Sequence, residues 1–404
     1  MKQPFALAPT APACPRHTRD WPRWVGLLML GVQTGGAAEL VVKAVNPLPI
    51  SRPRQTLELT AAQLAGLQAA DLRTVHVRDI QGGEVLCQAV DTDGDAYRKP
   101  DAVIFQADFR ANETKSFTVV TGAKQVYTKD QFQAYGRFVR ERFDDFAWEN
   151  DRIAHRMYGK ALETWAGEPL TSSTVDIWSK RTSRLVINDW YLTDDYHMDH
   201  GEGADFYSAG PSRGCGGSGI WEADRLWTSR NFINSRVLAN GPIRVLFELE
   251  YEPFDVNGRQ VREIKRVSLD AGSQLDQFTS LYLWESEDSA RPLVVGIGIK
   301  KNAGATKVFE AESGSLRVWE KMAKNAGMQG LGIVVKAGDL MGEREDPLNH
   351  LLLAKPGADL RLTYWAGFCW DKAGQITTSD AWKTYLADFA RGLACPVEVS
   401  VTTR

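Results

Sequence analysis

The segment Ile243–Trp284 reads IRVLFELEYEPFDVNGRQVREIKRVSLDAGSQLDQFTSLYLW and decides the fold. Its first part alternates apolar and polar residues, which is the pattern of a strand with one buried face. The apolar positions are Ile243, Val245, Phe247, Leu249 and Tyr251. Asn257-Gly258 is a strong sequence signal of a hairpin turn, after which Val261–Asp270 is expected to pair with the first strand. A second turn leads to a third strand segment, Leu275–Trp284. Three long strands joined by tight turns predict an antiparallel sheet.

Apolar segments of strand length continue to the end of the chain. They are Leu293–Lys300, Leu316–Glu320, Gly332–Val335, His350–Leu353, Leu360–Trp370 and Val397–Val401. One segment, Asp380–Leu393, has helical periodicity instead, with Asp380 as the N-cap or in the first turn and Gly392 near the end. We therefore expect a mostly β fold, a large antiparallel β-sandwich with few helices.

A smaller β-sandwich precedes the large one. Between Glu39 and Gly122, short apolar segments are separated by Gly, Asp or Asn, and one or two helical turns are expected at Ala61–Leu67. The strand segments are Leu40–Val45, Thr56–Leu59, Val75–Arg78, Val85–Val90, Ala102–Phe105 and Ser116–Val120. We therefore expect domains at residues 39–125 and 126–404.

The turn Asp91–Asp95, with Asp101 beyond it, spaces carboxylates like a calcium loop. Gly94 falls at the fourth position of this turn, whereas the EF-hand loop needs glycine at the sixth. We favour an acidic turn without a ligand. No cofactor is expected, although a divalent cation stays an alternative.

The first 38 residues have the pattern of a secretory signal peptide. Arg16, Arg19 and Arg23 precede the apolar run Trp24–Val32, and small residues follow up to Ala38. The run is shorter than the ~20 residues of a transmembrane helix. We expect cleavage near Ala38, a periplasmic or secreted protein, and no membrane contact after cleavage.

Four cysteines, Cys87, Cys215, Cys369 and Cys395, remain after the expected cleavage. They allow three disulfide pairings, and buried free thiols are an equal alternative in a domain of this size. No Cys/His spacing of a metal site occurs. The net charge of −3, without runs of one sign, gives no indication of a nucleic-acid partner.

The segment Tyr196–Gly217, YHMDHGEGADFYSAGPSRGCGG, concentrates ionisable, aromatic and glycine residues. No apolar period of two or 3.6 crosses it, so we expect an irregular stretch from Thr193 to Trp221. Loops of this length are uncommon unless they are functional or disordered. We interpret it as an active-site loop; the alternative is a packed Ω-loop without chemistry.

A second candidate segment is FAWENDRIAHRMYG. Alternation along a single strand would place Trp148, Asn150, Arg152, Arg156 and Tyr158 on one face. A guanidinium group can donate two parallel hydrogen bonds to a carboxylate, and an aromatic ring can stack on the apolar face of a sugar, so this face suits an acidic sugar. The alternative is a ladder of salt bridges between strands. Further candidate substrate-binding residues are Trp190, Asp199 and Arg213.

Several segments together resemble the domain-of-unknown-function family 4861. They are WENDRIAHRMYG, DIWSKR, YHMDHGEGADFY, GCGG, NGPIRVLFELEY and IKRVSLDAGSQL. The resemblance implies a secreted bacterial protein found among enzymes that degrade polysaccharides, especially uronate-rich glycans. The succession of strands is similar to the galactose-mutarotase-like β-supersandwich, although no mutarotase catalytic pair can be matched.

Three chemistries compete for these residues. In β-elimination, Arg152, Arg156 or Arg213 neutralises a uronate carboxylate and a second group moves the proton. The proton-transfer candidates are His197, Tyr196 and Tyr207. In glycoside hydrolysis, two carboxylates act as acid and base. The candidates for that pair are Glu149, Asp199, Glu202 and Asp205.

The third chemistry is a metal site made by His197, Asp199, His200 and Glu202, which we consider weaker because a metal needs ligands in fixed geometry. A non-catalytic glycan-binding protein is a further alternative. We expect an exported enzyme acting on uronate-containing oligosaccharides or polysaccharides, with a lyase slightly favoured over a hydrolase.

Overall fold

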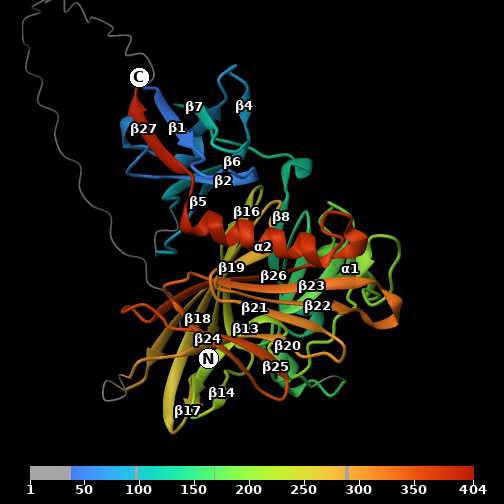
Figure 1. The fold of residues 1–404 in the computed structure, drawn as a ribbon. Helices are drawn as coiled ribbons and strands as arrows, with labels where there is room; N and C mark the ends of the chain where they lie inside the picture. The colour runs from blue at the N-terminus through green and yellow to red at the C-terminus, as the bar shows by residue number, and fades with distance from the viewer. Residues whose placement is uncertain (1–37, 96–98, 168, 287–290) are drawn as a thin grey trace, which may run out of the picture. The chain divides into compact units, whose positions relative to one another are not determined.

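The structure, a computed structural model, describes residues 38–95, 99–167, 169–286 and 291–404. The expected signal peptide falls almost entirely outside these residues and stays a prediction. The described chain is mostly β, with antiparallel sheets and the two α-helices α1 (Ile187–Thr193) and α2 (Ser379–Ala394) (Figure 1). The expected fold class is confirmed.

The segment that decides the fold forms the middle of a nine-stranded sheet. The sheet order is β15 (Phe232–Asn240), β16 (Arg244–Tyr251), β18 (Arg259–Asp270), β19 (Leu275–Trp284), β26 (Arg361–Trp370), β23 (Met328–Val335), β22 (Ser315–Lys321) and β21 (Thr306–Glu310). The Asn257-Gly258 turn joins β18 to the short strand β17 (Phe254–Val256), which interrupts the return from β16. The long strand β18 therefore pairs with β16 over one part of its length and with β17 over another.

Two five-stranded sheets accompany the large one. The first has the order β12 (Gly203–Ala204), β11 (Asp176–Lys180), β10 (Ile153–Met157), β9 (Asp145–Asn150) and β8 (Ala134–Val139). The second has the order β14 (Arg225–Trp227), β13 (Cys215–Glu222), β20 (Val295–Lys300), β25 (Asn349–Ala354) and β24 (Leu340–Glu345). Inward side chains of all three sheets form one hydrophobic core.

The N-terminal strands form two further sheets around a separate core. One has the order β27 (Glu398–Thr403), β1 (Leu40–Val45), β7 (Thr114–Thr121), β3 (Val75–Arg78) and β4 (Glu84–Val85), and the other β2 (Arg52–Thr60), β6 (Ala102–Phe109) and β5 (Cys87–Val90). The last strand of the chain thus completes the sheet that the first strand begins. The division at residue 125 stays a prediction.

Helix α2 confirms the expected helix and packs on β23. Thr378 is its N-cap, and Asp380 lies in the first turn. Trp382 is fully buried and donates its indole N–H to the carbonyl of Leu331. Gly330 lies beneath this ring, where any Cβ would approach the indole to 2.6 Å. A bare backbone on β23 therefore lets the helix approach the sheet.

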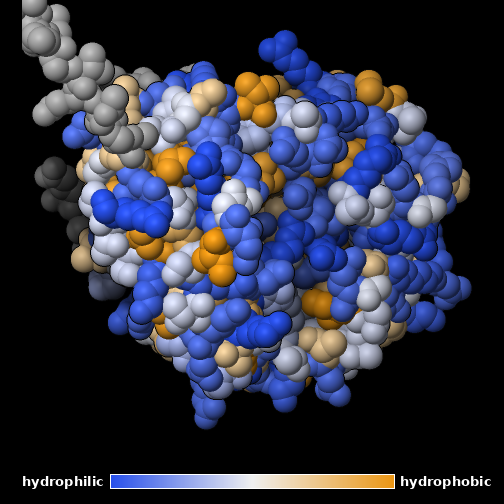
Figure 2. All heavy atoms as spheres, turned by 90° about the horizontal axis from the view of Figure 1, so that it is seen from above, coloured by the Kyte–Doolittle hydropathy of each residue, from blue (hydrophilic) through white to orange (hydrophobic). Residues whose placement is uncertain are grey.

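Short 3-10 turns complete the structure. They are Ala65–Leu67, Leu72–Thr74, Lys129–Gln131, Arg140–Arg142, Lys160–Thr164, Ala323–Asn325 and Asp371–Ala373. The turn at Ala65–Leu67 falls within the expected helical segment. Figure 2 shows a largely hydrophilic face on which apolar residues gather only in small, separate groups.

Candidate functional site

A pocket of about 320 Å³ opens beside the segment that was expected to be an active-site loop. Its walls come from β10 and β11, from the segment between these strands, from the segments before and after β12, and from the turn after β22. The lining residues are Arg156, Tyr158, Leu170, Asp176, His197, Asp205, Phe206, Tyr207, Ser208, Ala209, Gly210, Ala323 and Lys324. The volume is at the low end of the range for small-molecule sites.

Arg156 is the centre of the charged cluster at this pocket. Its Nε donates to Asp176 Oδ2 over 2.8 Å, and its Nη2 donates to Asp205 Oδ2 over 2.9 Å. A third carboxylate, Asp145, has its Oδ2 3.7 Å from Arg156 Nη1. All four side chains are at most 5% exposed. Buried charges of this kind must be paired, and here one guanidinium serves several carboxyl groups.

The local sequence explains how these groups meet. β10 pairs with β9 and β11, and the register sets Arg156 opposite Ala147 on one side and Asp176 on the other. β12 then pairs with the end of β11 immediately before Asp205. Gly203 makes this pairing possible, since it has φ +112° and a Cβ there would lie 2.0 Å from the carbonyl oxygen of Ser179.

The carboxyl groups differ in their tendency to hold a proton. Burial raises the pKa of Asp205 well above its usual range, and the neighbouring charge of Asp176 raises it further, against the effect of Arg156. Burial also raises the pKa of Asp145 to about 7, which Arg156 and Arg142 oppose. The cluster can therefore carry a proton near neutral pH.

Three tyrosines surround the cluster. The hydroxyl of Tyr158 donates to Asp176 Oδ2 over 2.9 Å. Tyr196 accepts from Arg142 Nε over 2.8 Å and stacks on Trp178, with 4.9 Å between ring centroids. Tyr207 lines the pocket, and its buried hydroxyl has no hydrogen-bond partner among the described residues. Burial raises the pKa of Tyr207 well above its usual range, so it is a neutral phenol.

His197 and Lys324 bring basic groups to the mouth of the pocket. The side chain of His197 is 60% exposed, and its Nδ1 lies 3.4 Å from Asp205 Oδ2. Lys324 is exposed on the turn after β22. The pocket thus joins a buried acidic floor to a basic, accessible rim.

The predicted single strand through Trp148 and Arg156 is wrong. The chain forms a β9–β10 hairpin instead, because Asn150 Oδ1 accepts the backbone N–H groups of Arg152 and Ile153 and so closes a tight turn. The turn interrupts the alternation, and Trp148 pairs across with His155 rather than sharing a face with Arg156.

Four expected substrate-binding residues lie away from the pocket. Trp148 is fully buried and donates to Asp276 Oδ1 over 2.6 Å. Asn150 is buried in its turn, and Arg152 pairs with Asp151. Arg213 is buried too, where its guanidinium donates to the hydroxyls of two serines, Ser172 and Ser173. Trp148 therefore cannot stack on a ligand, and Arg213 cannot reach one in the pocket.

The remaining acidic candidates make local ion pairs. Glu202 pairs with Arg184, and Asp199 pairs with Arg181 while its Oδ1 accepts two glycine N–H groups. Glu149 is buried with Lys180. These contacts separate the four carboxylates proposed for hydrolysis, of which only Asp205 lines the pocket.

The proposed metal ligands are also dispersed. His200 pairs with Asp195, whereas His197 turns toward Asp205. In the part of the chain that the structure describes, no three His, Cys, Asp or Glu side chains converge as metal ligands would. The carboxylates of the turn at Asp91 accept backbone N–H groups, as Asp91 Oδ1 does from Gly94.

The expected irregular stretch is shorter than predicted. α1 occupies Ile187–Thr193, β12 interrupts the loop, and β13 begins at Cys215 rather than after Trp221. Trp190, a half-buried residue of α1, stacks on Trp178 with 5.6 Å between centroids and does not line the pocket. The four cysteines of the described chain are free thiols.

Two central residues, Asp176 and Asp145, were missed from the sequence. Asp176 begins the apolar strand segment Asp176–Lys180, and a carboxyl group in a buried strand is a signal of a polar site. Asp145 stands likewise at the start of β9, where every residue is buried. A carboxyl group in an apolar strand segment can be recognised from the sequence. The convergence of Asp176 and Asp145 on Arg156 cannot, because it depends on how the strands pair.

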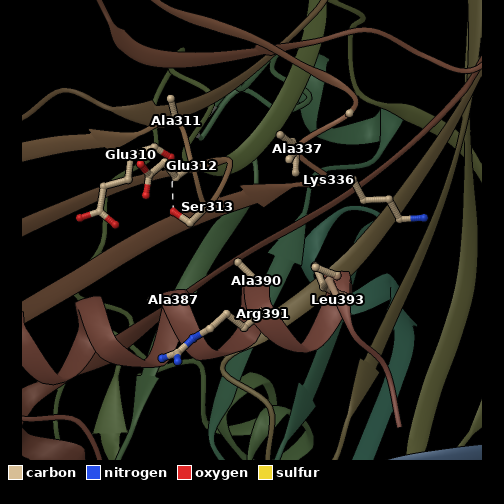
Figure 3. Close-up of a pocket in the computed structure, with 13 residues that line it drawn as sticks. Glu310, Ala311, Glu312, Ser313, Lys336, Ala337, Ala387, Ala390, Arg391 and Leu393 are labelled. Carbon is tan, nitrogen blue, oxygen red and sulfur yellow. Dashed lines mark hydrogen bonds between the residues drawn. The ribbon is translucent and has the colours of Figure 1, made fainter. Parts of the chain in front are cut away.

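A larger cavity of about 800 Å³ lies elsewhere, between α2 and the turn from β21 to β22. Figure 3 shows small apolar side chains such as Ala387 and Ala390 around it, with Arg391 and Lys336 at its edges. No cluster of buried ionisable groups comparable to that around Arg156 lines it. The smaller pocket is the candidate site on chemical grounds.

Comparison with known proteins supports the family resemblance. The family described as "Domain of unknown function (DUF4861)" matches residues 45–399. The chain belongs to the DUF4861 family. It is 30% identical over 378 residues to an "Uncharacterized protein P7" of Formosa agariphila, covering 89% of this chain and 93% of that protein.

Solved structures outside the DUF4861 family are more distant. One is a protein in the glycosyl hydrolase family 38 from Enterococcus faecalis, with a TM-score of 0.48, 10% identity and coverage of 91% of this chain and 48% of that one. Another is an alpha-mannosidase from Enterococcus faecalis V583, with a TM-score of 0.48, 9% identity and coverage of 90% and 46%. This chain spans about half the length of these structures.

No helix in the described part of the chain has the length and apolar character needed to cross a membrane.

Proposed function

We propose that this protein is an exported enzyme that cleaves uronate-containing saccharides by β-elimination. The observation that carries the proposal is the carboxyl pair Asp176 and Asp205, held by Arg156 at a pocket with a basic rim. A buried carboxyl group with a raised pKa is suited to proton transfer. The resemblance of the sequence to secreted proteins of polysaccharide degradation supports the substrate class.

The neutralising cation differs from the one expected. Arg156 already donates hydrogen bonds to Asp176 and Asp205, so we assign the uronate carboxylate to the exposed Lys324 at the pocket mouth. A cation there stabilises the charge that develops when the carbon next to the carboxylate loses its proton. Arg156 acts instead by holding Asp176 and Asp205 side by side through its Nε and Nη2.

The proton transfers then follow from the placement of His197 and Asp205. Neutral His197 removes the proton from the carbon next to the carboxylate, and the C–H electrons form the new C=C bond. The C–O bond to the leaving sugar breaks, and protonated Asp205 gives its proton to that oxygen. After the reaction His197 carries the proton from the substrate carbon, and Asp205 has lost its own. The 3.4 Å between His197 Nδ1 and Asp205 Oδ2 allows the proton on His197 to pass to Asp205 and restore the starting state.

A glycoside hydrolase is the second candidate. The specific observation in its favour is that burial, together with the neighbouring charge of Asp176, raises the pKa of Asp205, because a carboxyl group that keeps its proton beside a second carboxyl group can act as the acid. In this case Asp205 protonates the glycosidic oxygen, and Asp176 acts on water or on the sugar.

The test is incubation of the purified protein with a panel of plant and algal polysaccharides that contain uronates. New ultraviolet absorbance from unsaturated uronates is the expected result. Reducing ends without that absorbance would replace the lyase by the hydrolase. No cleavage of any uronate polysaccharide, with the folded state verified, would overturn the proposed function.

A further inference from the structure

One exposed and one half-buried aromatic ring stack on each other close to the pocket. Phe143 follows the turn Arg140–Arg142 and is 40% exposed, so part of its ring is open to solvent. Its ring stacks on that of Trp165, with centroids 4.4 Å apart and an interplanar angle of 21°. The guanidinium of Arg142 lies over the same indole, 4.9 Å from its centroid. We call Phe143 and Trp165 the aromatic platform.

The backbone holds Phe143 in a conformation that side chains disfavour. Phe143 has φ +49° and Asp144 has φ +69°, so two consecutive non-glycine residues are left-handed. Gly159 fits against this turn, since a Cβ at that position would lie 1.9 Å from the carbonyl oxygen of Asp144. Non-glycine residues held in this conformation cluster at active sites and ligand clamps.

A short chain of contacts connects the platform to the pocket. Arg142, whose guanidinium lies on the face of the Trp165 indole, donates from Nε to Tyr196 Oη over 2.8 Å, and Arg156 Nη1 lies 3.4 Å from the same oxygen. Arg156 lines the pocket. The platform is therefore separated from the pocket by little more than one arginine and one tyrosine side chain.

The loop that carries Trp165 begins and ends at residues that line the pocket. Tyr158 precedes the loop and Leu170 ends it, and both line the pocket. The N–H of Leu170 donates to the carbonyl of Leu162 over 3.2 Å and draws the loop back on itself. Trp165 stands between these two pocket residues in the chain.

We propose that the aromatic platform is a second saccharide subsite, which binds a sugar ring of the same chain whose uronate occupies the pocket. This inference rests on the proposed function. Phe143, which is stacked on Trp165 and 40% exposed, offers an aromatic face to the C–H side of a sugar, as aromatic faces do for other flat ligands. The enzyme then prefers oligosaccharides long enough to reach both places.

The chain offers well-matched variants for the test. Phe143→Gly removes the outer ring at a position whose left-handed φ suits glycine, so the backbone should be retained. Trp165→Ala removes the second ring. Trp227→Ala is the control, because Trp227 on β14 is another half-buried tryptophan with an arginine, Arg225, over its ring at 4.2 Å, and it does not line the pocket.

The experiment measures dissociation constants by calorimetry in an Asp205→Asn background, in which turnover is slowed. The ligands are short and long oligosaccharides prepared from each uronate polysaccharide of the panel. We expect Phe143→Gly and Trp165→Ala each to weaken binding of a long oligosaccharide about tenfold, or about 1.4 kcal/mol. Binding of a disaccharide and all binding by Trp227→Ala should stay unchanged.

The outcomes separate the two proposals. Length-independent binding, or equal losses for short and long ligands, would overturn the second subsite and leave the pocket as the saccharide site. Failure of any uronate saccharide to bind the folded Asp205→Asn protein or to be cleaved by the wild type would overturn both.

Discussion

Replacing Asp205 by asparagine should separate catalysis from stability. The side chain of Asp205 is fully buried, and burial together with the charge of Asp176 raises its pKa well above the usual range. Asparagine has nearly the shape of a protonated carboxyl group, and its side-chain oxygen can still accept the hydrogen bond that Arg156 Nη2 donates to Asp205 Oδ2 over 2.9 Å. We therefore expect Asp205→Asn to change the free energy of unfolding at pH 7 by less than about 1 kcal/mol.

The neighbouring carboxyl group provides the contrast. Asp176 accepts from Arg156 Nε over 2.8 Å and from the Tyr158 hydroxyl over 2.9 Å. A hydrogen bond of a charged group contributes about 1.5–3 kcal/mol, so Asp176→Asn should lower the free energy of unfolding by at least about 1.5 kcal/mol.

Asp205→Asn should lower turnover by about 10²–10⁴-fold, the usual contribution of a general acid.

The assays are denaturant unfolding at pH 7 and initial rates on the best polysaccharide of the panel. Equal destabilisation by the two substitutions would show that Asp205 is ionised and structural. Unchanged turnover in a folded Asp205→Asn variant would refute its role as the acid.

The other predictions concern His197, Asp145 and the N-terminus. His197→Ala should lower turnover by about 10²–10⁴-fold. Because the side chain of His197 is 60% exposed, thermal melting and ligand affinity should stay nearly unchanged. Parallel losses of stability in melts and of binding in titrations would indicate a structural histidine instead. The pKa of Asp145 is about 7 in the folded protein and about 3.9 when unfolded, so the native state binds the extra proton and stability should fall as pH rises from about 4 to 7. Unfolding of Asp145→Asn across this pH range should show a flatter profile, and an unchanged slope would contradict the assignment. N-terminal sequencing of the exported protein should begin near Glu39, whereas a start at Met1 would exclude cleavage.

Elements with strong local periodicity could be predicted from the sequence. The strand expected at Leu40–Val45 is β1 with the same bounds, and the helix expected at Asp380–Leu393 differs from α2 by one residue at each end. α1 was missed because its seven residues are too few to establish a helical period, and no side chain caps its start.

The candidate site was predictable only in part. His197, Asp205 and Tyr207 stand close together in a polar, glycine-rich segment, and the structure brings them to one pocket. The error at Trp148 came from extending alternation through Asn150, whose side chain closes a turn. A single hydrogen-bonded side chain thus reverses which residues share a face, and no period in the sequence records it.

The most direct test of the central claim is the crystal structure of Asp205→Asn with an acidic oligosaccharide that the wild-type protein cleaves. The account predicts a uronate in the pocket, its carboxylate beside Lys324 and its leaving oxygen within hydrogen-bond distance of the side chain at position 205. A saccharide bound outside this pocket, or in it with the leaving oxygen remote from position 205, would contradict the account.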